Sequence, residues 1–341
     1  MKRSLPDAAF LAACRGDQPP HRPLWIMRQA GRYLPEYRAM REKHTFLELC
    51  HDPAAAAEVT LQPIRRYGMD AAILFTDLLI PVEAMGVGLR YEPGPVLDRH
   101  VDTLEAVRRL RVPDPKKDIA PMLQAATRVR EALDPSKALI GFVGAPFTMA
   151  CYLIEGRGSK AWDDTRRLMF AEPETFDALL ARVVECLTPL VTALVEAGCD
   201  AIQVFDSWAG VLAADDFARR CAPHTDALLQ AARDAGAVAI TFVNGASQHL
   251  DRIAQMPADV AAVDWRMPMR KVRQRLPEDM CVQGNMDPAL LFADDDTLRA
   301  AVAEICKAAG SSGHVFNLGH GIQPSTDPAK LAVLVEEVRR W

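Results

Sequence analysis

Two arginines that lie four residues apart, Arg28 and Arg32, offer the clearest chemistry in the sequence. They are separated by residues 29–31, whose side chains are small or carry an amide, and they follow the apolar, strand-like residues 24–27. A guanidinium stays charged at any working pH and presents a planar fork of donors that matches a carboxylate or a phosphate. The segment therefore indicates an anion-binding loop after a strand. Its spacing also allows a solvated helix start whose arginines pair with Glu36 or other nearby acids.

Polar residues follow other apolar runs as well, at points where a strand would end. They are Asp77, Tyr152, Asp206, Ser207, Asn244, Asp264, Asn285, Asp287 and His320. In a barrel of parallel strands, the loops after the carboxyl ends of the strands meet at one face, and catalytic residues lie there. A surface that only maintained stability would not need polar residues at each of these points. The pattern therefore favours an enzyme.

Four of these residues have both an ordinary and a functional explanation. Asp77 could be a cap or the partner of an arginine, but if desolvated at a barrel mouth its pKa would shift and it could take a proton or stabilise a cation. Tyr152 could fill a core with its hydroxyl hydrogen-bonded. Ser207 lacks a G-x-S-x-G elbow and is a poor candidate nucleophile. His320 lies between two glycines, which permit close approach of backbone to a ligand.

Eight short apolar runs, each followed by a helix-like stretch, must position these residues. The runs are residues 24–27, 71–75, 139–143, 201–205, 238–243, 260–263, 281–283 and 315–318. They are continuously apolar rather than alternating, as strands buried on both faces should be. Acid–proline pairs such as Asp52-Pro53 indicate helix starts, and glycines such as Gly68 indicate helix ends.

The order of the runs predicts the fold class. Eight strand–helix units without a break in composition favour a single α/β domain over residues 1–341, a (β/α)8 TIM barrel. An open doubly wound sheet is the alternative, but the chain has no G-x-G-x-x-G or Walker-type loop. Residues 87–97 predict a small hairpin inserted after the second strand. Pro63 and Pro189 lie inside helical patterns and predict kinks or breaks.

The composition and the cysteine spacing give no indication of nucleic-acid binding, membrane insertion or metal binding. The chain has 341 residues, 50% of them hydrophobic, and a formal net charge of -5, which gives no reason to expect nucleic acid. The amino terminus lacks the apolar core of a signal peptide, and no segment approaches the roughly 18 unbroken apolar residues of a membrane span. The eight cysteines show no C-x-x-C pair and no metal-ligand spacing, so we expect buried free thiols and no metal site. These features predict a cytoplasmic protein without a membrane partner.

Eight motifs occur in the same order as in a known family. They are PLWIMRQAGRYLPEYR at 23–38, TLQPIR at 60–65, FTDLL at 75–79, GFVGAPFT at 141–148, YLIEG at 152–156, FDSWAG at 205–210, QGNMDP at 283–288 and NLGHGI at 317–322. On these motifs the chain closely resembles the uroporphyrinogen decarboxylase family of haem biosynthesis, and the first motif is highly specific. The resemblance covers nearly the whole chain and implies the barrel fold and a homodimer.

The resemblance also implies the roles of individual residues. The matching positions are Arg28, Gln29, Ala30, Gly31 and Arg32 for the substrate-binding loop, Asp77 for the carboxylate that binds the pyrroles, and Tyr152, Ser207 and His320 for further substrate contacts. One departure is Arg157, where the family commonly has glycine, and we expect its side chain to face solvent.

The implied substrate is uroporphyrinogen III, a ring of four pyrroles that carries four acetates and four propionates. Removal of CO₂ from each acetate gives coproporphyrinogen III. A protonated pyrrole of the substrate can accept the electron pair left on carbon, so no cofactor is implied. Asp77 would stabilise the pyrrole cation and Arg28 would clamp a carboxylate, and these two are the implied catalytic residues. We expect Arg28 or a water that it holds to deliver the proton, although Arg28 and Tyr152 are both weak acids.

Two other classes of protein remain as alternatives. A zinc-dependent corrinoid or thiol methyltransferase would need a His-x-Cys pair and a later cysteine at strand ends. The segment around His320 lacks that cysteine, and Cys281 begins its strand, away from the mouth. A non-catalytic tetrapyrrole carrier would retain the arginines but would not need Asp77 in an apolar setting.

Overall fold

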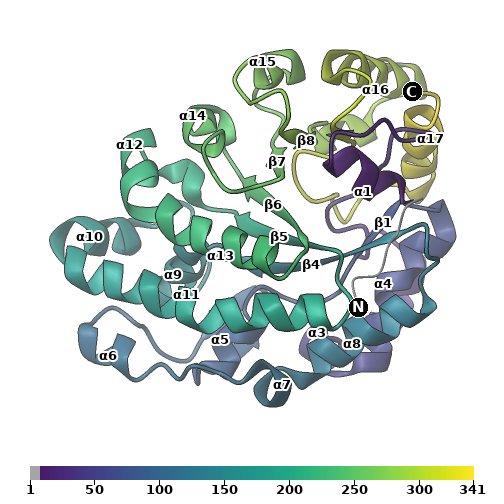
Figure 1. The fold of residues 1–341 in the computed structure, drawn as a ribbon. Helices are drawn as coiled ribbons and strands as arrows, with labels where there is room; N and C mark the ends of the chain where they lie inside the picture. Colours follow the sequence, from purple (N-terminus) through teal and green to yellow (C-terminus); the bar gives the residue numbers. More distant parts are fainter. Residues whose placement is uncertain (1–7) are drawn as a thin grey trace.

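The computed structural model describes residues 8–341, which form an α/β fold around a curled parallel sheet of seven strands, a TIM-barrel-like arrangement (Figure 1). The sheet order is β1-β4-β5-β6-β7-β8-β9, and neighbouring strands in it pair in parallel. The strands are β1 (Ala71–Ile73), β4 (Ala138–Gly144), β5 (Ala201–Asp206), β6 (Val238–Val243), β7 (Val260–Val263), β8 (Cys281–Gln283) and β9 (His314–Val315). Seven of the eight predicted runs therefore contain or overlap strands of this sheet.

The first predicted run, residues 24–27, is not a strand, and that part of the prediction is wrong. Leu24 makes only an isolated parallel bridge with Phe316, beside the last strand. Side chains replace part of a strand's backbone hydrogen bonding here. The Leu24 N–H donates to the carboxylate of Asp70 over 3.0 Å, and the Met27 N–H donates to Oδ1 of Asn317 over 2.9 Å. The segment is buried, and its backbone donors are satisfied partly by side chains and partly by the Phe316 carbonyl, which accepts from the Trp25 N–H over 3.4 Å.

The helices connect the strands and cover the outer face of the sheet (Figure 1). They are α1 (Ala9–Cys14), α2 (Pro35–Arg41), α3 (Phe46–His51), α4 (Pro53–Tyr67), α5 (Ile80–Ala84), α6 (Leu104–Arg108), α7 (Pro115–Asp118), α8 (Ala120–Ala132), α9 (Pro146–Glu155), α10 (Asp163–Ala171), α11 (Pro173–Glu196), α12 (Ala214–Asp216), α13 (Ala222–Asp234), α14 (Leu250–Ile253), α15 (Met269–Arg273), α16 (Asp295–Ala309) and α17 (Pro328–Val338). Short 3₁₀ or π turns occupy Ala209–Val211, Phe217–Cys221, Ala246–Gln248 and Pro288–Phe292.

The helix ends follow the expected capping chemistry. Asp52 accepts hydrogen bonds from the N–H groups of Ala54 and Ala55 at the start of α4, and Gly68 ends that helix in the left-handed conformation. Of the kinks or breaks predicted at Pro63 and Pro189, breaks do not occur, because α4 and α11 each continue past the proline.

A separate antiparallel pair, β2 (Leu89–Tyr91) and β3 (Pro95–Leu97), follows β1 and α5 in the chain. Its register places Tyr91 opposite Pro95. The aromatic ring of Tyr91 packs on Phe46, with ring centroids 4.9 Å apart. The pair therefore brings one aromatic residue over the end of β1.

Two apolar clusters, inside and outside the sheet, stabilise the fold. The inner cluster joins alternate strand residues to α1, and its aromatic members include Phe205 and Phe242, whose ring centroids lie 5.5 Å apart. The larger outer cluster lies between the sheet and the helices. All eight cysteines are buried free thiols, as predicted.

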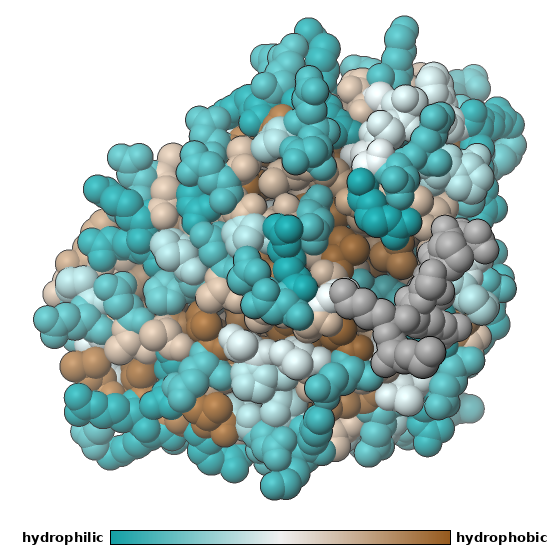
Figure 2. Space-filling model, viewed as in Figure 1, coloured by the Kyte–Doolittle hydropathy of each residue, from teal (hydrophilic) through white to brown (hydrophobic). Residues whose placement is uncertain are grey.

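One helix of the described residues, α11, is long and apolar enough to cross a membrane. Its apolar stripe, which includes Phe176, Val183 and Leu187, is buried inside the fold, so α11 is a core helix. Figure 2 shows one face of the molecule, which is largely hydrophilic, with apolar side chains gathered mainly in recesses between polar ones. The amino-terminal residues 1–7, on which the prediction about a signal peptide partly depends, lie outside the described residues.

Candidate active site

The loop after residues 24–27 holds Arg28 and Arg32 in a tight turn. The Gln29 N–H donates to the carbonyl of Ile26 over 2.8 Å, and Arg28 adopts a positive φ of 64°. Gly31 is required at its position, since a Cβ there would lie 2.8 Å from the carbonyl oxygen of Arg28. The sequence of the turn thus fixes where both arginines emerge.

Both arginines are exposed, and neither forms an ion pair with any acid among residues 8–341. Glu36, the partner that the spacing allowed, instead pairs with Arg66 over 3.3 Å. The alternative in which Arg28 and Arg32 are neutralised by local acids is therefore wrong. Two unpaired guanidinium groups are available to bind an anion.

Gln29 faces the other way. Its side chain is fully buried, accepts a hydrogen bond from the Ile26 N–H over 3.0 Å and donates to the carbonyl of Ala71 over 3.1 Å. It fastens the arginine loop to β1 and leaves no amide group free for a ligand. Ala30 and Gly31 are partly exposed in the same loop as the arginines.

Asp77 follows β1 and is partly exposed. One carboxylate oxygen accepts a hydrogen bond from the Leu79 N–H over 2.9 Å. Burial raises the pKa of Asp77 above its usual range, whereas Tyr91, the Leu79 N–H and the positive charge of Arg28 lower it. The Tyr91 hydroxyl is buried and completes no hydrogen bond. Asp77 is thus a carboxylate within electrostatic reach of Arg28, with a spare oxygen.

Tyr152 lies on α9 and is held by aromatic neighbours. Its ring meets Trp162 edge to face with centroids 5.3 Å apart, and Trp208 at 6.2 Å. Burial raises the pKa of Tyr152 to about 12, and the charge of Asp77 acts in the same direction while that of Arg28 opposes it. The hydroxyl therefore remains protonated at neutral pH and can donate a hydrogen bond.

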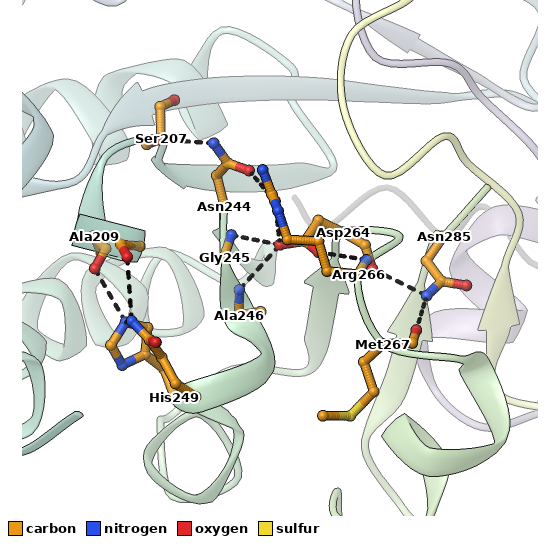
Figure 3. Close-up of polar contacts among 12 residues, drawn as sticks. Ser207, Ala209, Asn244, Gly245, Ala246, His249, Asp264, Arg266, Met267 and Asn285 are labelled. Atoms are coloured by element: carbon orange, nitrogen blue, oxygen red, sulfur yellow. Dashed lines mark hydrogen bonds and ion pairs between the residues drawn. The ribbon is translucent and has the colours of Figure 1, made fainter. Parts of the chain in front are cut away.

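Ser207 follows β5 in the loop that also carries Trp208. The carbonyl of Ser207 accepts a hydrogen bond from the side-chain amide of Asn244 over 3.1 Å (Figure 3). Its hydroxyl forms no hydrogen bond among the described residues, so it is available to a ligand.

His320 lies beside Arg28. The Ile322 N–H donates to the carbonyl of Met27 over 2.9 Å, and Gly321 packs directly against the side chain of Arg28. The pKa of His320 is lowered to about 4, first by burial and then by the charges of Arg28 and Arg266, while Asp264 opposes the shift. The imidazole is therefore neutral at pH 7 and can both donate and accept.

The structure thus gathers most of the predicted residues around Arg28. Contacts or electrostatic interactions join Arg28 to Asp77, Tyr152 and His320, and Ser207 is linked to Tyr152 through the neighbouring Trp208. Arg157 is exposed, as expected, and its backbone bridges to Val96 of β3.

Sequence reasoning missed two residues of this region, Tyr91 and Arg266. Tyr91 belongs to the β2–β3 pair, and only the fold brings it near Asp77. Arg266 follows β7 by three residues and could have been found by asking which cations, as well as acids, come after each strand.

A hollow lies at the opposite end of the strands. It has a volume of about 1540 Å³ and is lined by residues of α1 and of segments that precede strands, including Cys14, Cys199 and Asp259. No group of three or more possible metal ligands occurs among residues 8–341.

A family model described as uroporphyrinogen decarboxylase (URO-D) matches residues 5–341. The chain belongs to this family. Among its curated relatives, the uroporphyrinogen decarboxylase of Geobacter metallireducens is 45% identical over 332 residues, which cover 97% of this chain and 98% of that protein. The uroporphyrinogen decarboxylase of Syntrophotalea carbinolica is 46% identical over 335 residues, 98% of each chain.

Solved structures confirm the fold of this uroporphyrinogen decarboxylase family member but carry no argument about activity. A methyltransferase from Methanosarcina mazei superposes with a TM-score of 0.81 over 99% of each chain, at 20% sequence identity. A B12-independent methionine synthase from Shewanella superposes with a TM-score of 0.56 at 12% identity.

Proposed function

We propose that the chain is a uroporphyrinogen decarboxylase that removes CO₂ from the four acetate side chains of uroporphyrinogen III and releases coproporphyrinogen III. The full-length match to curated decarboxylases carries this proposal. The site supports it, because a carboxylate, Asp77, lies near an unpaired arginine, Arg28, as a polyanionic substrate with a cationic intermediate requires. The reaction belongs to porphyrin and haem biosynthesis.

Asp77 is proposed to bind the pyrrole N–H groups and to stabilise the positive charge that develops on a pyrrole. Its Oδ1 is partly used by the Leu79 N–H, which orients the carboxylate, and the other oxygen can accept from the substrate. A fixed anion that faces a developing cation is commonly worth about 3–4 kcal/mol of barrier. Protonation of the pyrrole supplies the electron sink for loss of CO₂, so the proposal needs no cofactor.

The substrate's carboxylates are proposed to bind Arg28 and Arg32, with hydrogen bonds from Tyr152, Ser207 and His320. The backbone of Ala30 and Gly31 would line the same loop. Gln29 is proposed to contribute through this loop rather than through its amide, whose two ends already bind backbone groups. A neutral imidazole at His320 accepts or donates without adding a cation.

The proton donor is proposed to be Arg28 or a water that it holds. His320 is deprotonated at neutral pH, and Tyr152, whose pKa is raised to about 12, is a weak acid. Arg28 is also a weak acid, but its guanidinium has no hydrogen-bond partner among residues 8–341, and its charge acts on Asp77, Tyr152 and His320.

The experiment is anaerobic incubation of the purified, chelator-treated protein with uroporphyrinogen III, followed by chromatographic counting of carboxylates. Products with seven, six, five and four carboxylates are expected. Tight binding without any product would favour a tetrapyrrole carrier instead.

We also propose the finer features of the molecule. The match over residues 5–341 supports one domain across the chain. Residues 24–27, although not a regular strand, are proposed to fill the gap between β9 and β1 and so to close the barrel. The bridge from Leu24 to Phe316 and the hydrogen bond from the Asp70 N–H to the Leu24 carbonyl support this. The β2–β3 pair would then be a hairpin inserted after β1, the second segment of the barrel wall. A homodimer in the cytoplasm is proposed from the family resemblance.

A further inference from the structure

We propose that Arg266 forms a third carboxylate-binding site, which holds one acetate or propionate of the tetrapyrrole on the side of His320 away from Arg28. This inference rests on the proposed function for the identity of its ligand. The site itself consists of an arginine fixed on one edge and open on the other.

The fixed edge of Arg266 is provided by the loops after β6 and β7. Nη1 of Arg266 lies 2.9 Å from Oδ1 of Asn244 and 3.1 Å from Oδ2 of Asp264 (Figure 3). The guanidinium also lies over the ring of Trp265, 4.6 Å from its centroid. These contacts restrict the rotamers of a long side chain before any ligand arrives.

Asp264 does not depend on Arg266 alone. Its carboxylate accepts hydrogen bonds from the N–H groups of Gly245, Ala246 and Arg266, the last over 2.8 Å, and its side chain is only 1% exposed. Because three backbone donors already satisfy this carboxylate, neutralising Asp264 does not by itself account for the arginine.

The open edge of Arg266 faces solvent. Its side chain is 48% exposed, and neither Nε nor Nη2 has a partner among residues 8–341. A guanidinium with a free Nη2–Nε fork is the donor geometry that binds a carboxylate in a bidentate manner.

Backbone contacts connect this edge to the candidate active site. Gly319 packs against Trp265, since a Cβ at residue 319 would lie 2.5 Å from the Trp265 nitrogen, and Gly321 packs against Arg28. His320 is therefore flanked by Arg28 on one side and by the Trp265–Arg266 segment on the other. The charge of Arg266 also lowers the pKa of His320, which agrees with this proximity.

Asn244 links Arg266 to a third loop, because its amide donates to the carbonyl of Ser207 over 3.1 Å. The sheet order places β5, β6 and β7 side by side, so these loops emerge next to one another. Arg28 and Arg32 follow the segment on the far side of β9. A tetrapyrrole ring that spans the mouth would thus meet a cation at both edges.

The test compares Arg266→Gln and Arg266→Lys with a matched control, Arg270→Gln. Arg270 is an exposed arginine on the next helix, α15, and its side chain forms no hydrogen bond or ion pair among residues 8–341. We would measure KM and kcat for uroporphyrinogen III, the Kd of the fluorescent octacarboxylate uroporphyrin, and Tm for each variant.

Arg266→Gln is expected to raise KM and the uroporphyrin Kd by roughly tenfold with kcat within about twofold of wild type, as loss of one charge-assisted pair predicts. The KM and Kd of Arg266→Lys should lie between those of wild type and Arg266→Gln, because a lysine keeps the charge but loses the planar fork of donors. Arg270→Gln should leave all of these values unchanged. If Arg266→Gln fails to fold, the proposal is tested by Arg266→Lys alone: a raised KM supports the carboxylate site, and an unchanged KM overturns it.

A lower Tm in Arg266→Gln with unchanged KM and Kd would assign the arginine to Asp264 alone and overturn the proposal. Equal loss of affinity in Arg270→Gln would also overturn it, since the effect would then be one of net charge. If wild type binds uroporphyrin but turns over no uroporphyrinogen, the proposed function fails. A weaker Kd in Arg266→Gln would still support the carboxylate site in that case.

Discussion

Arg28 and His320 belong to loops that are bound to each other, because Gly321 packs on the Arg28 side chain and the Ile322 N–H donates to the Met27 carbonyl over 2.9 Å. Segments almost three hundred residues apart in the chain thereby meet at one site. The arginine's charge and burial together keep His320 neutral. The site therefore combines a strong cation with an uncharged imidazole.

This relationship predicts the titration of His320. Its pKa is about 4 in the folded protein against 6.5 for a free histidine, so the folded state binds fewer protons than the unfolded state between these values. The contribution of His320 to stability should therefore fall as pH drops from about 6.5 to about 4. NMR of the imidazole nitrogens should show a midpoint near 4, and a higher midpoint in Arg28→Gln. A midpoint at or above 6.5 in wild type would contradict the account.

Arg28 and Arg32 are predicted to differ in their kinetic effects. Arg32→Ala should raise KM by roughly tenfold with little change in kcat, because it removes one carboxylate contact. Arg28→Ala should raise KM and also lower kcat, since Arg28 lies near Asp77 and His320. Steady-state kinetics with uroporphyrinogen III would show the difference. Identical profiles for the two variants would contradict the distinct role given to Arg28.

Buried Asp206 predicts a pH dependence of the protein's stability. Its side chain is fully buried, Oδ1 accepts a hydrogen bond from the Thr148 hydroxyl over 2.8 Å, and Oδ2 has no partner. Burial raises its pKa to about 7. Between about 4 and 7 the folded state therefore binds more protons than the unfolded state, and stability from this group is lost as pH rises.

Asp206→Asn cannot ionise and should remove this loss. The free energy of unfolding of wild type, relative to Asp206→Asn, should decrease from pH 5 to pH 8 in urea denaturation. Parallel pH profiles for the two proteins would show that Asp206 stays ionised throughout, against the prediction.

Much of the barrel could be predicted from local pattern. Buried parallel strands are continuously apolar, and the runs at 238–243, 260–263 and 281–283 match β6, β7 and β8 residue for residue. The run at 24–27 has the same composition but forms only an isolated bridge, because the side chains of Asp70 and Asn317 accept from the Leu24 and Met27 N–H groups in place of neighbouring strand carbonyls. Such side-chain partners are brought by the fold and cannot be recognised from the run itself.

For the site as well, local sequence predicted which residues take part but not how their side chains are oriented. Residue types and their positions after strands indicated Asp77, Tyr152 and His320, but the direction of each side chain depends on tertiary contacts. Gln29 is turned inward by its bonds to Ile26 and Ala71. Arg266 was missed because one of the residues that position it, Asn244, comes from a different loop.

The most direct test of the central proposal is loss of CO₂ in Asp77→Asn beside wild type. Removing a preorganised charge of this kind is expected to lower kcat by roughly 10²–10³-fold. Asp296→Asn, an exposed acid in the first turn of α16, is the matched control. Both proteins would be treated with chelator and incubated anaerobically with uroporphyrinogen III, and the carboxylates of the products counted over time.

The account predicts conversion to the four-carboxylate product by wild type and Asp296→Asn, and almost none by a folded Asp77→Asn. Full activity in folded Asp77→Asn would contradict the role of Asp77 as the stabilising anion. Absence of any product with wild type would contradict the decarboxylase function itself.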